Sequence, residues 1–117
     1  CNNVRLSLKD FKEIKNSKLR QILLKMNKPY IRNIFKDTGI KAALMYDPLT
    51  VFYLINPKAA KTFNCNIVIE TKSNLARGMT VADLRKNPEE KNNITVVEII
   101  DEKEFKECFI ETLSKNI

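Results

Sequence analysis

Histidine, long apolar runs and clustered cysteines are all missing from this sequence. No stretch approaches the roughly 18 apolar residues that a membrane span requires, and none has the charged start and apolar middle of a signal peptide. We therefore expect no membrane partner. Cys1, Cys65 and Cys108 are far apart and odd in number, so they predict neither a metal site nor a disulfide framework. Reduced thiols are typical of the cytoplasm, and we expect a cytoplasmic protein.

The length of 117 residues is enough for one domain with a modest core, and we expect a single domain over residues 1–117. The first residue is cysteine rather than methionine, which favours a fragment or a processed piece. The formal net charge of +7 favours polyanions as partners. The lysines, however, are scattered through every segment, so a nucleic-acid partner is disfavoured.

The first half of the sequence has the apolar spacing of amphipathic helices. We expect a short strand over 4–6 and then a short helix with Ser7 as its N-cap. A second helix follows, and Pro29 is expected to interrupt it. With Asn27 as a possible cap, a third helical segment then begins and ends at Gly39.

The second half changes to the period of strands. Alternating apolar residues predict a half-buried strand over 63–70, and 79–83 returns to form a hairpin. The charged stretch 85–93 is expected to be a solvent loop. β-branched residues over 94–100 predict a third strand, after which Asp101 caps a last helix. The predicted fold class is α+β, with a helical N-terminal half, short antiparallel strands and a C-terminal helix.

The most distinctive stretch is an apolar helix with Asp47 at its start. Asp is a preferred N-cap, and Pro48 then occupies the first helical position. Asn56-Pro57 ends the helix, because a residue before proline resists the helical conformation. Residues 49–55 are apolar with one exception, so we expect this helix to be buried nearly all round. A carboxylate at its tip would be held as rigidly as a metal or sugar ligand.

Four stretches carry a family resemblance: Asp47-Pro48-Leu49, Tyr53-Leu54-Ile55-Asn56-Pro57, 69–72 (Ile-Glu-Thr-Lys) and 76–83 (Ala-Arg-Gly-Met-Thr-Val-Ala-Asp). Together they resemble the C-terminal part of the inosine-uridine preferring nucleoside hydrolases. The similarity covers almost the whole chain but only the later part of a family member. The Asp-rich N-terminal calcium motif of that family is absent from this sequence.

The resemblance implies hydrolysis of the N-glycosidic bond between ribose and base, assisted by a calcium ion. Asp47 stands at the position of the family's C-terminal calcium ligand, where it would also bind the substrate; a plain N-cap is the alternative. Calcium takes six to eight oxygen ligands, so one aspartate does not make this site alone. We therefore expect calcium in the complete family enzyme and no cofactor in this chain alone.

Two tyrosines complete the implied site. Tyr46 stands where the family usually has the histidine that protonates the departing base. A tyrosine hydroxyl, with an ordinary pKa of about 10, is a poor proton shuttle at neutral pH, which disfavours the purine-type acid mechanism. Tyr30 falls in the family's helix over the base pocket, where aromatic side chains touch the base. The alternative for both tyrosines is a packed core residue.

The resemblance favours the C-terminal portion of a nucleoside N-ribohydrolase, inactive alone and completed by an N-terminal portion. The alternative is a non-catalytic α+β remnant that acts as a structural or protein-interaction domain. In a truncated fold, the apolar residues Leu49, Val51, Phe52 and Leu54 would lose cover, and each uncovered large side chain forgoes roughly 1.5–3 kcal/mol. We therefore expect the N-terminal portion, or self-association, to cover that face.

Overall fold

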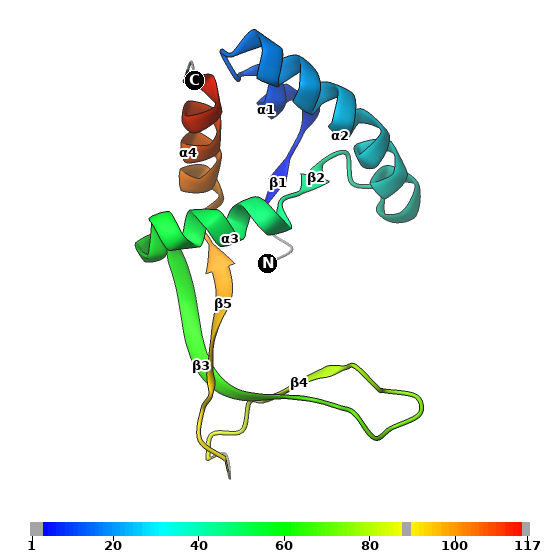
Figure 1. Cartoon of the computed structure of the whole chain (residues 1–117), viewed down its shortest axis with the longest axis vertical. Coiled ribbons are helices and arrows are strands. Elements are labelled where there is room, and N and C mark those ends of the chain that lie inside the picture. The colour runs from blue at the N-terminus through cyan, green and yellow to red at the C-terminus, as the bar shows by residue number, and fades with distance from the viewer. Residues whose placement is uncertain (1–3, 88–89, 116–117) are drawn as a thin grey trace. The chain divides into compact units, whose positions relative to one another are not determined.

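The computed structural model describes residues 4–87 and 90–115, and the chain divides into two compact units (Figure 1). Unit 1 comprises Cys1–Ala60 and Ile99–Ile117, and unit 2 comprises Lys61–Glu98. A single domain over residues 1–117 stays a prediction.

The described part of unit 1 contains the four helices α1 (Leu8–Lys12), α2 (Ser17–Thr38), α3 (Tyr46–Ile55) and α4 (Glu102–Ser114). It also contains the antiparallel pair β1 (Arg5–Leu6) and β2 (Ala43–Leu44), and the 3-10 turn η1 (Pro57–Ala59). The helical N-terminal half and the C-terminal helix are thus as predicted. None of the helices in the described ranges has both the length and the apolar character needed to cross a bilayer.

A run of aromatic rings joins three helices in the core of unit 1. Phe11 of α1 meets Phe109 of α4 edge to face, and Phe109 stacks on Phe105 with ring centroids 5.7 Å apart. Phe105 in turn meets Phe52 of α3 edge to face. Such pairs contribute about 0.5–1.5 kcal/mol beyond their buried area. The rings therefore hold α1, α3 and α4 together.

The predicted helix ends are confirmed at four positions. Ser7 caps α1 in a reciprocal capping box, because its hydroxyl accepts the Asp10 N–H at 3.3 Å while the Asp10 carboxylate accepts the Ser7 N–H at 2.6 Å. Gly39 ends α2 with a φ of 73°, which a glycine adopts without a Cβ clash. Asn56 is the C-cap of α3, and Asp101 caps α4.

Pro29 does not interrupt α2, contrary to the sequence-based prediction, and lies inside one continuous helix. Proline removes one intrahelical hydrogen bond. However, Ile31 just beyond it is buried, so tertiary packing of the second half of α2 outweighs that loss. Asn27 does not cap a new helix either; its Nδ2 donates to the carbonyl of Leu23 at 2.9 Å.

The start of α3 also differs from the prediction. Asp47 is not the N-cap but lies in the first helical turn, and Met45 is an N-cap without a side-chain hydrogen bond. Pro48 is tolerated in that turn because the first N–H groups of a helix have no intrahelical acceptor. The first helical bond runs from the Leu49 N–H to the Met45 carbonyl at 3.2 Å.

The prediction that α3 is buried nearly all round is wrong. Leu49 and Phe52 are 3% and 5% exposed, whereas Val51, Leu54 and Ile55 are 57%, 76% and 67% exposed. Packing within the chain covers one side of the helix only. The loss of cover expected in a truncated fold is therefore confirmed at Val51 and Leu54 and wrong at Leu49 and Phe52. The other side, formed by Val51, Leu54 and Ile55, is an uncovered apolar surface that we call the outer face of α3.

Unit 2 contains the sheet β4-β3-β5, built from β3 (Ala60–Ile69), β4 (Thr80–Asp83) and β5 (Ile94–Ile100); the ends of β3 and β5 extend into unit 1. β3 and β4 form the predicted antiparallel hairpin, with Asn66 opposite Asp83 and Ile69 opposite Thr80. The predicted third strand over 94–100 is also confirmed.

Burial in the described part of unit 2 is slight. Cys65 of β3 is 3% exposed, whereas Phe63 and Ile69, expected on the same half-buried face, are 37% and 54% exposed. The burial prediction for this strand is therefore wrong at those two positions. Polar bonds hold the strand instead: Asn93 donates its N–H to the Cys65 carbonyl at 3.2 Å and its Nδ2 to the Ile67 carbonyl at 3.0 Å.

Candidate functional site

The candidate catalytic and metal-binding residues lie side by side in the first turn of α3. Tyr46 is the first residue of the helix and is 50% exposed, and Asp47 follows it and is also exposed. Strand β2 ends at Leu44, just before this turn. The buried residues Met45 and Leu49 anchor the turn from within. The local fold therefore fixes the backbone and leaves both candidate side chains exposed to solvent.

The described residues alone do not fit a calcium site. Calcium takes six to eight oxygens, several of them from carboxylates. Within residues 4–87 and 90–115, no group of three or more histidine, cysteine, aspartate or glutamate side chains could hold a metal ion. Asp47 offers a single carboxylate at the start of a helix.

Tyr30 lies apart in the sequence, on α2, and is 38% exposed. Tyr46 accepts a hydrogen bond at its backbone carbonyl from the Thr50 hydroxyl at 3.4 Å. The exposure of both tyrosines argues against the alternative that they are packed core residues. Adjacency in the chain brings Tyr46 and Asp47 together, whereas Tyr30 comes from a separate helix.

Two carboxylates of unit 2 have lowered pKa values. Arg85 donates from Nε to Asp83 Oδ1 at 2.9 Å and from Nη2 to Asp83 Oδ2 at 2.6 Å, which lowers the pKa of Asp83 to about 2. Backbone N–H groups of Ser73 and Lys72 donate to Glu70 Oε1 at 2.9 and 2.6 Å and lower the pKa of Glu70. Both groups are ionised at neutral pH and accept hydrogen bonds from residues close to them in the sequence.

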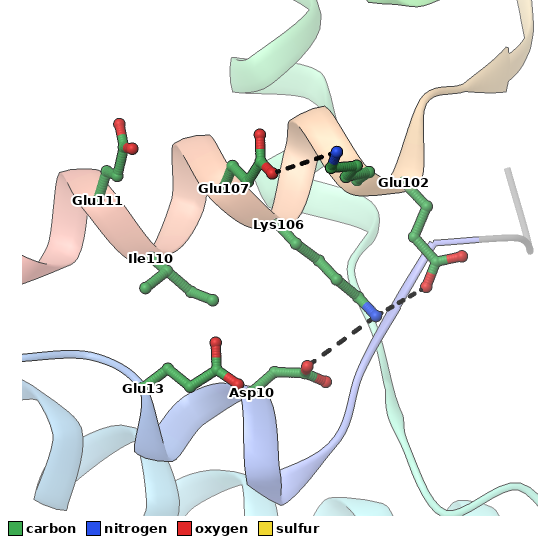
Figure 2. A pocket seen from close by; sticks show the side chains of 8 residues that line it. Asp10, Glu13, Glu102, Lys106, Glu107, Ile110 and Glu111 are labelled. Atoms are coloured by element: carbon green, nitrogen blue, oxygen red, sulfur yellow. Dashed lines mark ion pairs between the residues drawn. The ribbon is translucent and has the colours of Figure 1, made fainter.

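A hollow of about 630 Å³ lies between α1 and α4, and acidic side chains dominate its lining (Figure 2). Lys106 extends between the two helices, with its Nζ 3.0 Å from Glu102 Oε1 and 4.0 Å from Asp10 Oδ1. Lys103 pairs with Glu107 at 3.9 Å. Lysines thus neutralise three of these carboxylates. The hollow is lined by this network of ion pairs and includes no residue of the α3 turn.

Sequence reasoning did not single out a positively charged hollow of unit 1. Lys9, Lys28, Arg32 and Lys41 lie around it and come from α1, α2 and the segment before β2. Only the i, i+4 spacing of Lys28 and Arg32 on one helix was visible in the sequence as a sign of proximity. The other two cations come close only through tertiary folding.

The sequence model of the family described as inosine-uridine preferring nucleoside hydrolase matches residues 1–107. This chain therefore belongs to the inosine-uridine preferring nucleoside hydrolase family. An uncharacterized protein of Schizosaccharomyces pombe is 34% identical over 92 residues, which are 79% of this chain and 29% of that protein. The pyrimidine-specific ribonucleoside hydrolase RihA of Shewanella sp. strain MR-4 is 34% identical over 76 residues, which are 65% of this chain and 24% of RihA.

Solved structures confirm the predicted α+β fold class. A plant nucleoside hydrolase, the PpNRh1 enzyme, aligns with a TM-score of 0.79 and 17% identity over 97% of this chain and 38% of that one. A purine-preferring ribonucleoside hydrolase from Gardnerella vaginalis aligns with a TM-score of 0.79 and 22% identity over 95% of this chain and 36% of that one. The chain thus spans well under half the length of each of these relatives.

Proposed function

We propose that this chain is the C-terminal portion of a nucleoside N-ribohydrolase, which hydrolyses the N-glycosidic bond of purine or pyrimidine ribonucleosides to base and ribose. The family match over residues 1–107 carries this proposal, and the Asp47-Pro48-Leu49 motif at the exposed start of α3 agrees with it. Because the chain covers 38% and 36% of the two nucleoside hydrolase structures described above, we assign the activity to the completed protein and none to this chain alone.

Each candidate residue has a role in this proposal. Asp47 would be the residue of this chain that helps to hold calcium, in a site completed by the N-terminal portion, and it would also contact the ribose hydroxyls. Tyr46 donates a hydrogen bond toward the departing base, and the ring of Tyr30 contacts that base. The exposure of Tyr46 and Tyr30 supports these roles, because a buried side chain could not reach a substrate.

The outer face of α3 supports the proposed partner. Val51, Leu54 and Ile55 are each more than half exposed, and fully burying a side chain of this kind contributes at most roughly 1.5–3 kcal/mol, so covering the exposed part of each contributes less. The N-terminal portion of the hydrolase, or a second copy of this chain, would provide that cover. The free thiols of Cys65 and Cys108 support a cytoplasmic location, where thiols stay reduced.

Complementation tests the proposal. The chain is co-expressed with a separate N-terminal portion that carries an Asp-x-Asp-x-x-x-Asp-Asp motif, and ribose release from inosine and uridine is measured with and without calcium. We expect release only from the pair with calcium. Because even indirect metal contacts are worth 10–100-fold, Asp47→Asn is expected to lower release by about 100-fold or more, whereas the exposed control Asp37→Asn leaves it unchanged. Ribose release by the lone chain contradicts the proposal.

The uncovered face of α3 also favours the alternative, a non-catalytic remnant that acts as an interaction domain. Sedimentation of the lone chain separates the two functions when read together with complementation. A stable homo-oligomer that stays inactive with every N-terminal portion supports the remnant. A pair that forms and releases ribose excludes it.

A further inference from the structure

The positively charged hollow of unit 1 has a volume of about 420 Å³. The charged residues that line it are all cations, namely Lys9, Lys28, Arg32 and Lys41. All four are exposed, and in the described part of the chain none of them takes part in an ion pair. The carboxylate nearest in sequence, that of Asp10, is engaged by Ser7 and Lys106. The four positive charges are therefore available to a ligand.

Helix α2, which contributes Lys28 and Arg32 to the hollow, adds to the positive electrostatic potential there. α2 carries six lysine and arginine residues against the single acid Asp37, whereas α4 carries four glutamates against two lysines. The excess of positive charge on α2 is already present in its sequence, and the fold brings Lys9 and Lys41 beside Lys28 and Arg32 of that helix. Charge of one sign around a concave surface concentrates oppositely charged ligands there.

The lining also offers a rigid aromatic edge. Phe35 lines the hollow, is 43% exposed, and has the Lys41 Nζ 4.9 Å from its ring centroid. This cation–π contact orients Lys41 beside the ring. Ile31, which also lines the hollow, is 6% exposed and gives it an apolar floor. Cations next to an exposed aromatic ring are the combination that holds phosphates and bases together.

We propose that this hollow binds the phosphate backbone of a single-stranded polynucleotide. The cations come from three separate segments and surround a concave surface, which suits a flexible phosphate chain. A flat anionic bilayer is instead bound by an apolar helix face that inserts between the lipids. Duplex DNA is read by an element that projects into a groove. This binding is separate from the proposed hydrolysis and does not depend on it.

The number of cations gives a quantitative expectation. Each neutralised phosphate of a single strand contributes about 0.7 to the slope of log affinity against log salt. Four phosphates give a slope of about −2.8, so affinity falls about 50-fold between 50 and 200 mM salt. We expect this slope for the 117-residue chain with a fluorescein-labelled 20-nucleotide oligo-dT, followed by fluorescence anisotropy.

Two variants of equal net charge separate the hollow from bulk charge. K9Q/K28Q/R32Q/K41Q removes the lining cations, and K58Q/K72Q/K86Q/K115Q removes four exposed cations elsewhere. We expect the first variant to lose about tenfold or more in affinity at 50 mM salt and most of its salt slope, and the second to keep a slope near −2.8. Equal losses in both variants would show that net charge alone binds the strand, and that outcome overturns the proposal.

Single substitutions guard against a folding defect. K28Q and K41Q change exposed side chains, and each is expected to make the slope shallower by about 0.7 while circular dichroism stays unchanged. Competition with inorganic polyphosphate and with phosphatidylserine vesicles distinguishes other anions. Displacement of the oligonucleotide by either competitor at equal phosphate concentration overturns the assignment to a polynucleotide.

Discussion

The ring of Phe52 in α3 meets the ring of Phe105 in α4 edge to face, with centroids 5.5 Å apart and planes at 89°. Phe105 is 1% exposed and also stacks on Phe109, so its removal leaves a cavity between α3 and α4. We expect Phe105→Ala to lower the free energy of unfolding by about 3–5 kcal/mol in urea titrations. Leu75→Ala, at a side chain 99% exposed, is the control and should change it by less than about 0.5 kcal/mol.

The capping box of Ser7 makes a second prediction. Ser7→Ala removes the acceptor of the Asp10 N–H and is expected to lower the free energy of unfolding by about 1 kcal/mol. Ser17→Ala is the matched control, because Ser17 is the first residue of α2 and not its cap, which is Asn16. Thermal unfolding followed by circular dichroism measures both. Equal effects of the two substitutions would mean that the cap contributes nothing.

Replacing Pro29 is expected to stabilise the chain. Pro29 is exposed inside α2, and a proline there costs about 3 kcal/mol relative to alanine. Part of that gain is lost because alanine also frees the unfolded chain, so we expect Pro29→Ala to raise the free energy of unfolding by about 1–3 kcal/mol. Gln21→Ala, at an exposed position earlier in α2, should change it far less. Destabilisation by Pro29→Ala would show that packing requires the proline ring.

The Asp83–Arg85 pair predicts a pH effect of defined sign. The folded pKa of about 2 lies below the ordinary value of 3.8, so the pair favours the folded state above pH 3.8 and loses this effect as pH falls through about 2. Carbon-13 NMR of the Asp83 carboxyl is expected to show a midpoint near 2. Arg85→Gln should raise that midpoint toward 3.8, whereas Arg77→Gln should leave it unchanged. A midpoint near 3.8 in the unsubstituted chain contradicts the pairing.

Local signals in the sequence predicted most of the secondary structure. Capping at Ser7, Gly39 and Asp101 depends on a few neighbouring residues, so it can be read without the rest of the fold. The predicted interruption at Pro29 was wrong because tertiary packing of Ile31 offsets the hydrogen bond that the proline removes. That packing involves residues distant in the sequence, so the local pattern does not show it. The cap assigned to Asp47 was wrong because the helix begins one residue earlier, at Tyr46. Met45 is its N-cap, so Asp47 lies inside the first turn.

Features that depend on tertiary packing could be predicted only in part from the sequence. The truncated length predicted the exposure of Leu54, but an apolar stretch does not show which of its residues the rest of the chain covers, so the burial of Leu49 and Phe52 could not be foreseen. The pair Tyr46 and Asp47 could be predicted because the residues are adjacent and the family motif includes Asp47. The grouping of Lys9 with Lys41 could not, because no local pattern links α1 with the segment before β2.

In the described part of unit 2, Cys65 is the one apolar side chain that is buried. Hydrogen bonds between the strands, together with those of Asn93, hold the sheet. Segments with so few buried apolar contacts open at a low free energy while the remaining structure stays intact. Amide protons of β4 are therefore expected to exchange with deuterium earlier than those of α4. Limited proteolysis will then begin in the turn around Leu75, which leaves the aromatic cluster of unit 1 as the last part to unravel.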